Sequence, residues 1–239
     1  AIITQDRVAL RAAPRDSAKQ QAVLWPGEMV EVRGERMDYL QVYDYKRERG
    51  GFVRASEARR VRLAAEEAPE LLAVARFVRD TAGAEALGIG FIAAYIQAAP
   101  VEAINGEAGS EALDALGTMA DRLARRVSSG SAAHKSAEAA LSAHLDVAAN
   151  YGIKFANYER DGRMRICYDG DAFRRILTMD STVEQRARAV LALTRDECVD
   201  PNLRMTERIR LDEWRADVLD RVDAAALPPI VSWGTSPED

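Results

Sequence analysis

Apolar and polar residues alternate along the first quarter of the chain, and this pattern predicts strands. The alternation is clearest over residues 29–33 and 39–43, and turn-forming residues separate the runs, namely Pro26-Gly27, Gly34 and Gly50-Gly51. Short period-two runs between turns are typical of half-buried strands. Four or five such strands within about sixty residues favour a small barrel, because closure removes the exposed edges of a sheet. The residues expected to fill it are Leu10, Leu24, Val30, Val32, Leu40, Val42 and Val53.

Beyond Val61 the apolar residues recur every three or four positions, and Ala, Leu, Glu and Arg become frequent. This spacing predicts amphipathic helices. A loop is expected at 105–109, and Arg160-Asp161-Gly162 predicts the turn of a short hairpin. We expect helices beginning near Pro69, over 85–98, through 113–127, from about 133 to 150, near 171–177, from a capping box at Ser181 to Glu184, and through Leu211, Trp214 and Val218.

Four short motifs in the opening stretch resemble those of bacterial SH3 (SH3b) domains. Residues 8–14 (VALRAAP) are similar to an L-N-V-R-x-G-P signature, and residues 26–32 (PGEMVEV) to K-G-x-x-V-x-V. Residues 39–42 (YLQV) are similar to W-x-x-V, and residues 51–53 (GFV) to G-W-V. The resemblance covers about residues 3–62. It implies an SH3-like barrel that binds peptidoglycan, its stem peptides or another envelope protein.

The expected fold therefore has two domains, a small all-β SH3-like barrel and a mainly α-helical domain with at most one short β-hairpin. We place the barrel at 1–62, the helical domain at 66–227 and a loosely ordered tail at 228–239. The net charge of −5 is unevenly spread, because residues 1–62 hold 13 Lys and Arg against 9 Asp and Glu. A mildly basic module on an acidic body suits an anionic polymer, although ordinary solvated charge explains it equally well.

Aromatic residues of the predicted barrel are the candidate ligand contacts. Tyr39 and Tyr43 alternate with Leu40 and Val42, so the two tyrosines should leave the core side together. Aromatic rings suit flat sugar or peptide faces, and arginine suits carboxylates. The alternative is that the aromatics only complete the barrel. The predicted ligand-binding set is Trp25, Tyr39, Tyr43, Tyr45, Arg47, Arg49 and Phe52.

The sequence carries no recognised catalytic motif. His134 and His144 precede both cysteines, the reverse of the order in NlpC/P60-type peptidases, and the Glu-Ser pair of lytic transglycosylases does not occur. Residues 88–93 match G-x-G-x-x-A, but they lie within a helical pattern and no strand precedes them, so close helix packing is the better interpretation. We expect no catalytic residue, cofactor or metal site, and the scattered basic residues argue against nucleic acid as a partner.

Cys167 and Cys198 bracket two predicted helices, and an antiparallel helical pair would bring them together. We expect them to form a disulfide in an exported protein. The chain begins at Ala1 without a hydrophobic leader, which fits a periplasmic or otherwise exported protein whose signal peptide has been removed. The most apolar run, 84–101, is too short and too interrupted to cross a membrane.

These observations favour a non-enzymatic binding or adaptor protein of the cell envelope. Its SH3b module would recognise peptidoglycan, stem peptides or an envelope protein, and its helical body would offer a second surface. The first alternative is a peptidoglycan-acting enzyme with an unrecognised carboxylate site in the helical body, for which a pocket with two converging acidic groups would speak. The second is a structural adaptor whose SH3b module packs on its own helical body.

Overall fold

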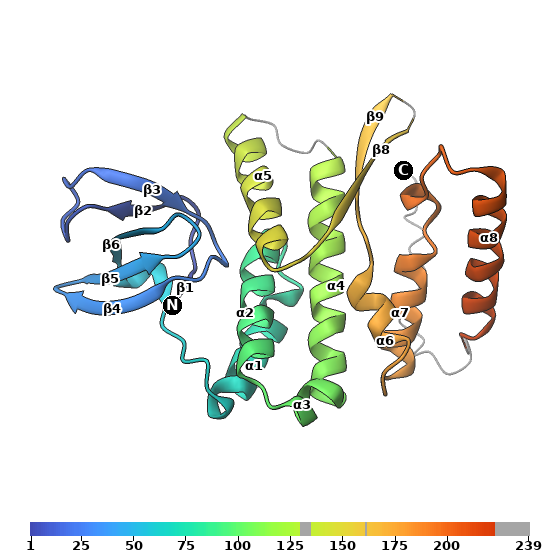
Figure 1. Ribbon diagram of the computed structural model, residues 1–239, viewed down its shortest axis with the longest axis horizontal. Coiled ribbons are helices and arrows are strands. Elements are labelled where there is room, and N and C mark those ends of the chain that lie inside the picture. Colours follow the sequence, from blue (N-terminus) through green and yellow to red (C-terminus); the bar gives the residue numbers. More distant parts are fainter. Residues whose placement is uncertain (130–134, 161, 223–239) are drawn as a thin grey trace, which may run out of the picture.

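The computed structural model describes residues 1–129, 135–160 and 162–222, with strands β1 to β7 first and then helices, between which the β8–β9 hairpin lies (Figure 1). The strands are β1 (Ile2–Ile3), β2 (Val8–Arg11), β3 (Gln20–Leu24), β4 (Glu31–Arg36), β5 (Tyr39–Asp44), β6 (Arg49–Arg54), β7 (Ala58–Arg59), β8 (Phe155–Arg160) and β9 (Arg163–Tyr168). The α-helices are α1 (Ala68–Arg79), α2 (Glu85–Ala98), α3 (Val101–Asn105), α4 (Glu107–Ser128), α5 (Lys135–Asn150), α6 (Asp171–Ile176), α7 (Val183–Leu193) and α8 (Met205–Asp220). Short 3₁₀ helices are η1 (Ala55–Glu57), η2 (Ala65–Glu67) and η3 (Asp196–Cys198).

The N-terminal strands form an open sheet. Five of them pair antiparallel in the order β3-β2-β6-β5-β4, while β1 and β7 form a separate two-stranded sheet. The predicted closed barrel is therefore wrong, because within the described residues the edge strands β3 and β4 do not pair with each other. Alternation did identify the buried face: Val32 is partly buried, and the other predicted core residues, Leu10, Leu24, Val30, Leu40, Val42 and Val53, are buried together. A period of two shows which face is buried, but it does not show whether two distant edges meet.

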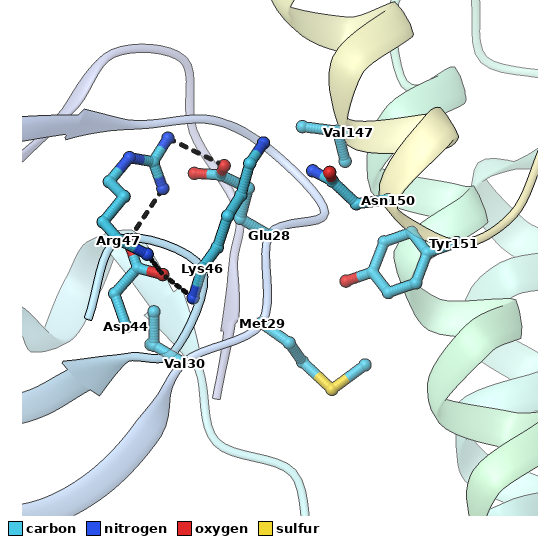
Figure 2. A pocket seen from close by; sticks show the side chains of 9 residues that line it. All are labelled: Glu28, Met29, Val30, Asp44, Lys46, Arg47, Val147, Asn150 and Tyr151. Atoms are coloured by element: carbon cyan, nitrogen blue, oxygen red, sulfur yellow. Dashed lines mark hydrogen bonds and ion pairs between the residues drawn. The ribbon is translucent and has the colours of Figure 1, made fainter. Parts of the chain in front are cut away.

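Strand β1 contributes to both the core of the sheet and the core of the helices, and the structure does not show the predicted split into two domains. The two residues of β1 point to opposite sides, as successive strand residues do. Ile2 packs within the helical core and Ile3 within the core of the sheet. The turn that precedes β4 lies against the helices, beside the side chain of Tyr151 (Figure 2). The hydroxyl of Tyr151 donates to the carbonyl of Gly27 at 2.5 Å. The limits proposed for the individual domains stay a prediction.

The helical core surrounds α2, which is buried on nearly all sides as the sequence predicted. Gly88 lets α2 approach α4, because an added Cβ atom would lie 2.2 Å from the sulfur of Met119. At Gly90 the neighbour is not a helix, because an added Cβ atom would lie 2.6 Å from the Cα atom of Gly27. The loop expected at 105–109 is wrong, because α3 ends at Asn105 and α4 begins at Glu107.

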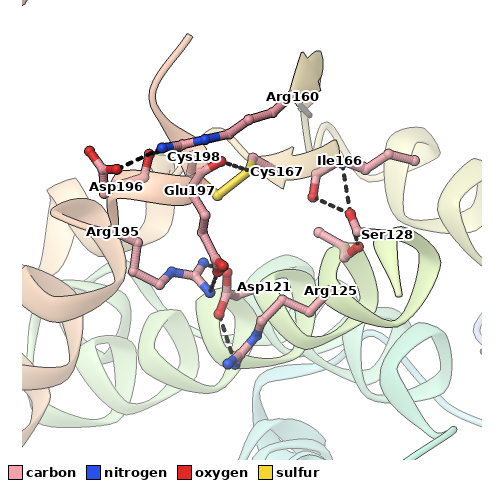
Figure 3. Close-up of a disulfide and its surroundings, with 11 residues drawn as sticks. Asp121, Arg125, Ser128, Arg160, Ile166, Cys167, Arg195, Asp196, Glu197 and Cys198 are labelled. Carbon is pink, nitrogen blue, oxygen red and sulfur yellow. Dashed lines mark hydrogen bonds and ion pairs between the residues drawn. A yellow bond between two sulfur atoms is a disulfide. The ribbon is translucent and has the colours of Figure 1, made fainter. Parts of the chain in front are cut away.

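The C-terminal region contains the predicted hairpin, β8–β9, followed by α6, α7 and α8. The capping box of α7 uses Thr182 and Gln185, one residue later than predicted. The predicted disulfide is confirmed between Cys167 on β9 and Cys198 at the end of η3, with 2.09 Å between the sulfur atoms (Figure 3). It brackets α6 and α7, the helical pair whose return was expected to bring the cysteines together. The tail predicted at 228–239 lies outside the described residues.

Candidate binding site

A pair of aromatic rings, one half-buried and one exposed, lies at the end of β5. The rings of Tyr43 and Tyr45 meet edge-on, with centroids 4.9 Å apart, and Tyr45 is 65% exposed. The guanidinium of Arg33 lies 4.0 Å from the centroid of Tyr43. Glu31 accepts a hydrogen bond from the Tyr45 hydroxyl at 3.0 Å and from Arg33 at 2.8 Å. We call these four residues the Tyr43–Tyr45 cluster.

The acidic member of this cluster is held ionised. The Arg33 guanidinium, followed by the Tyr45 hydroxyl, keeps the pKa of the Glu31 carboxyl below its usual range. Hydrogen bonds to a carboxylate favour its charged form and so lower its pKa. The cluster therefore presents two aromatic rings, a guanidinium and a carboxylate, which suit a ligand with flat or apolar faces and polar edges.

A cleft of about 800 Å³ adjoins the cluster. We call it the β4 cleft, because one wall is the edge of β4 with the residues just before it, and the other is the linker after β7. Tyr45 and Glu31 belong to both the cluster and the cleft. Arg60 of the linker pairs with Glu35 of β4, and Arg62 pairs with Glu67 at 2.6 Å. The apolar lining consists of Met29, Val30, Val32, Val61 and Leu63.

Tyr39 does not belong to this exposed surface. Its side chain is only 2% exposed, and its hydroxyl donates to Asp16 at 2.6 Å. Arg54 lies 5.3 Å from the centroid of the same ring and also binds Asp16. The hydrogen bond from the Tyr39 hydroxyl to Asp16 raises the pKa of that hydroxyl. Burial leaves Tyr39 as a packing residue that holds the β2–β3 connection to the sheet.

Trp25 and Arg47 also make contacts within the chain. The ring of Trp25 meets His144 of α5 edge-on, with centroids 6.0 Å apart. Arg47 lies between the carboxylates of Glu28 and Asp44, at 3.0 and 2.7 Å (Figure 2). The structure thus does not bring these two residues to the Tyr43–Tyr45 cluster.

Phe52 and Arg49 lie on β6 and complete the predicted set. Phe52 pairs in register with Gln41 and is half-buried. The exposed Arg49 donates to the backbone carbonyl of Gln21 at 2.8 Å, on the side of β3. Of the predicted ligand contacts, the structure therefore brings Tyr43 and Tyr45 together and leaves the others apart from the β4 cleft.

Two buried acidic groups converge in a smaller cavity of about 130 Å³ between the sheet and α5. These are Glu28 and Asp44, which are 8% and 3% exposed. Arg47 binds both of them, Glu28 also accepts from the backbone of Trp25, and Asp44 accepts from the backbone of Lys46. This carboxylate pair shares one guanidinium and has its oxygen atoms occupied by hydrogen bonds, so it fits a structural role better than acid–base chemistry.

Sequence reasoning missed Arg33 and Glu31, although the signal was present. Glu31 pairs in register with Tyr43, so alternation along β4 already placed Glu31 and Arg33 on the outward face. The linker residues Arg60, Arg62 and Leu63 had no such signal, because they lie in neither a strand nor a helix. Their position depends on where the linker leaves the sheet.

No family model matches the chain, and no solved structure matches it significantly. Across the described ranges, no group of three or more His, Cys, Asp and Glu residues is arranged to hold a metal ion. His134 lies outside those ranges. Of the helices that the structure describes, none is both long enough and apolar enough to cross a membrane.

Proposed function

We propose that this chain is a non-enzymatic binding or adaptor protein of the cell envelope, and that its ligand site is the Tyr43–Tyr45 cluster with the adjoining β4 cleft. The observation that carries this proposal is the arginine-flanked pair of aromatic rings, of which the exposed Tyr45 also lines the β4 cleft. Exposed aromatic rings beside a cleft are typical of recognition sites, because they offer a large apolar contact at little entropic cost.

The ligand class follows from the resemblance of residues 8–53 to SH3b domains. That resemblance directs the proposal to peptidoglycan, its stem peptides or an envelope protein. Stem peptides and sugar rings offer both flat faces and carboxylates, which match the rings of Tyr43 and Tyr45 and the guanidinium of Arg33. We therefore propose the relationship of residues 8–53 to SH3b domains together with the function.

Export is supported by the Cys167–Cys198 disulfide. Structural disulfides persist in oxidising compartments such as the periplasm and are rare in reducing ones. Cys167 is only 6% exposed, which protects the bond from exchange with thiols in solution.

A separate observation favours a structural role for the sheet, namely that it packs on the helical body of the same chain. Trp25 packs on His144, and the Nε2 of His144 donates a hydrogen bond to the Oδ1 of Asp6 at 2.8 Å. These contacts attach the sheet to α5. None of Trp25, His144 and Asp6 lines the β4 cleft, so docking of the sheet and ligand binding are compatible with each other.

The test is a sedimentation assay with purified peptidoglycan, comparing wild type with Tyr45→Ala. We expect the variant to lose on the order of 2 kcal/mol of binding, or about thirtyfold in affinity, as for a central aromatic anchor. The matched control is Phe77→Ala, since Phe77 is an 83% exposed aromatic residue on α1 that does not line the cleft. Circular dichroism and urea unfolding establish that both variants are folded.

Equal binding by wild type and folded Tyr45→Ala would place the site elsewhere. If wild type does not sediment with peptidoglycan, the wall-polymer ligand is wrong, and pull-down from an envelope fraction tests the envelope protein in its place. Loss of binding in Phe77→Ala as well would indicate a nonspecific aromatic effect.

A further inference from the structure

A second cavity, of about 180 Å³, lies in the C-terminal region and is lined in part by α8. We call it the α8 pocket. Its apolar walls are Leu211 and Trp214 of α8 together with Tyr168, Phe173 and Leu193. An apolar cavity of about 150 Å³ is large enough for benzene, so the α8 pocket has room for one aromatic ring or one branched aliphatic side chain.

Helix α8 borders this pocket without packing closely on the helices beside it. Of its sixteen residues only Val218 is buried, while Leu211 and Trp214 are half-buried. The small apolar core formed mainly by α6 and α7 contains no residue of α8. A polar contact helps to hold the helix, because Arg215 donates to the backbone carbonyl of Thr194. The two half-buried apolar side chains of α8 therefore line a cavity instead of filling a core.

The α8 pocket also presents two charged groups that form no ion pair within the described part of the chain. They belong to Arg174 of α6 and to Asp169, two residues before α6. The Nη1 atom of Arg174 lies 3.6 Å from the position that a Cβ atom would take at Gly170, and its guanidinium has no hydrogen-bond acceptor among the described residues. The carboxylate of Asp169 accepts a hydrogen bond from the backbone N–H of Asp171 at 3.0 Å.

The other charges in and beside the α8 pocket are paired. Asp121 and Arg195 belong to the lining and bind each other. Arg175 and Asp171 lie next to the pocket on α6 and pair at 3.0 Å. Within the described lining, one positive and one negative group thus remain for a ligand. A guanidinium suits a carboxylate and a carboxylate suits an ammonium group, so the matching ligand carries both charges.

We propose that the α8 pocket binds a free amino acid with an aromatic or branched apolar side chain. The apolar side chain would lie among Leu211, Trp214 and Phe173. The carboxylate of the ligand would bind Arg174, and its ammonium group would bind Asp169. The α8 pocket shares no lining residue with the β4 cleft, so this inference does not rest on the proposed function.

The experiment compares L-phenylalanine with two analogues that each lack one charge, using the full chain and calorimetry. Hydrocinnamate has the ring and the carboxylate, and phenethylamine has the ring and the ammonium group. We expect each analogue to bind about tenfold more weakly than L-phenylalanine, because each loses one charge-assisted hydrogen bond. In amide hydrogen exchange, bound L-phenylalanine should slow exchange in α8 and leave the N-terminal sheet unchanged.

Two variants assign the charges to residues. Arg174→Gln should weaken binding of L-phenylalanine by about tenfold and leave phenethylamine unchanged, because that analogue has no carboxylate. Asp169→Asn should weaken L-phenylalanine by a similar factor without weakening hydrocinnamate, and asparagine keeps an oxygen atom for the backbone hydrogen bond. The matched controls are Arg175→Gln and Asp171→Asn, which change neighbouring charges outside the lining and should bind L-phenylalanine as wild type does.

The inference is overturned if L-phenylalanine does not bind the folded full chain at millimolar concentrations, or if both analogues bind as tightly as L-phenylalanine does. Equal losses in Arg174→Gln and Arg175→Gln would indicate a general effect of charge and would also overturn it. Binding without slower exchange in α8 would place the ligand at another site. If a variant does not fold, the two analogues on wild type still test both charges.

Discussion

The two ends of the molecule are attached to the same helical core by different kinds of contact. The N-terminal sheet docks through close backbone packing and apolar side chains. The C-terminal region, from β8 to α8, is held on α4 by buried ion pairs in addition to apolar packing, and a disulfide within the region joins β9 to η3. The two attachments should therefore respond to different perturbations.

On the N-terminal side, the decisive contact is between two glycines. Gly27, in the turn before β4, has φ of 88°, and an added Cβ atom there would lie 2.1 Å from the carbonyl oxygen of Ala86 on α2. Gly90 faces Gly27 from the same helix. This contact tolerates no extra volume and involves no formal charge.

On the C-terminal side, the central helix α4 presents two buried aspartates seven residues apart, on the same face. Asp114, 1% exposed, binds Arg188 of α7 at 2.9 Å and also Arg79 of α1. Asp121 binds Arg195 and Arg125 close to the disulfide (Figure 3). Buried ion pairs therefore add to the close packing on this side, where Gly117 of α4 lies against Phe173 of α6, whereas the contact at Gly27 involves no formal charge.

The disulfide should contribute the largest effect. Replacing Cys167 and Cys198 with alanine should lower the free energy of unfolding by roughly 3–4 kcal/mol, because the bridge closes a loop with a sequence separation of 31 residues. Urea unfolding of wild type and variant measures this. The reductant control should destabilise wild type alone. Two alkylated thiols in folded, freshly isolated wild type, without reductant, would contradict the bridge.

Gly27→Ala should lower the free energy of unfolding by about 3 kcal/mol, nearly as much as removal of the disulfide. The added methyl group clashes in a packed interface, and the backbone at this position has the left-handed conformation. Gly152→Ala is the matched control, because Gly152 has φ of 82° but no atom within 4 Å of an added Cβ atom. The control variant should lose only about 1 kcal/mol of unfolding free energy, because it has the strained backbone without the clash. Equal losses in urea unfolding would mean that the sheet does not dock closely at Gly27.

Asp114→Asn should lower the free energy of unfolding by about 2 kcal/mol. This is less than the loss expected from breaking a fully buried ion pair, because the Arg188 side chain is 42% exposed. Hydrogen exchange should increase in α7 and α8 and remain unchanged in the N-terminal sheet. The control is Asp171→Asn, which removes an exposed pair with Arg175 and should change stability by less than about 0.5 kcal/mol. Faster exchange in the sheet would show that the two attachments are coupled.

Tyr39→Phe should have the smallest effect, a modest loss of stability without loss of ligand binding. The Tyr39 hydroxyl, followed by Arg54, lowers the pKa of Asp16 in the folded protein. A lowered pKa contributes stability above the unfolded value, near pH 4, and this contribution is lost as the pH falls through the folded value. The difference between wild type and variant in urea unfolding should therefore shrink from pH 7 to pH 2.5. Weaker peptidoglycan sedimentation by folded Tyr39→Phe would instead assign Tyr39 to the ligand site.

Much of the local structure could be predicted from the sequence. The change from a period of two to a period of 3.6 near Val61 separated strands from helices, and α2 was predicted at its observed limits. The β8–β9 hairpin followed from its Asp-Gly turn, and the Cys167–Cys198 bridge from two cysteines around a helical pair. These features depend on neighbouring residues or on simple helix geometry.

The candidate site could be predicted only in part. Alternation correctly placed Tyr43 on the outward face, and it placed Tyr39 there too, but Asp16 and Arg54 cover that ring. Trp25 and Arg47 are engaged by His144, Glu28 and Asp44, partners that local spacing cannot identify.

The sequence by itself determined the elements and their buried faces, because hydrophobic periodicity is local. The tertiary structure alone decided that the sheet stays open, that Ile2 joins the helical core, and that the linker after β7 forms a cleft with β4. The physical reason is that these features depend on which distant segments approach one another. Packing across the Gly27–Gly90 contact directs that approach, and no pattern along the chain records it.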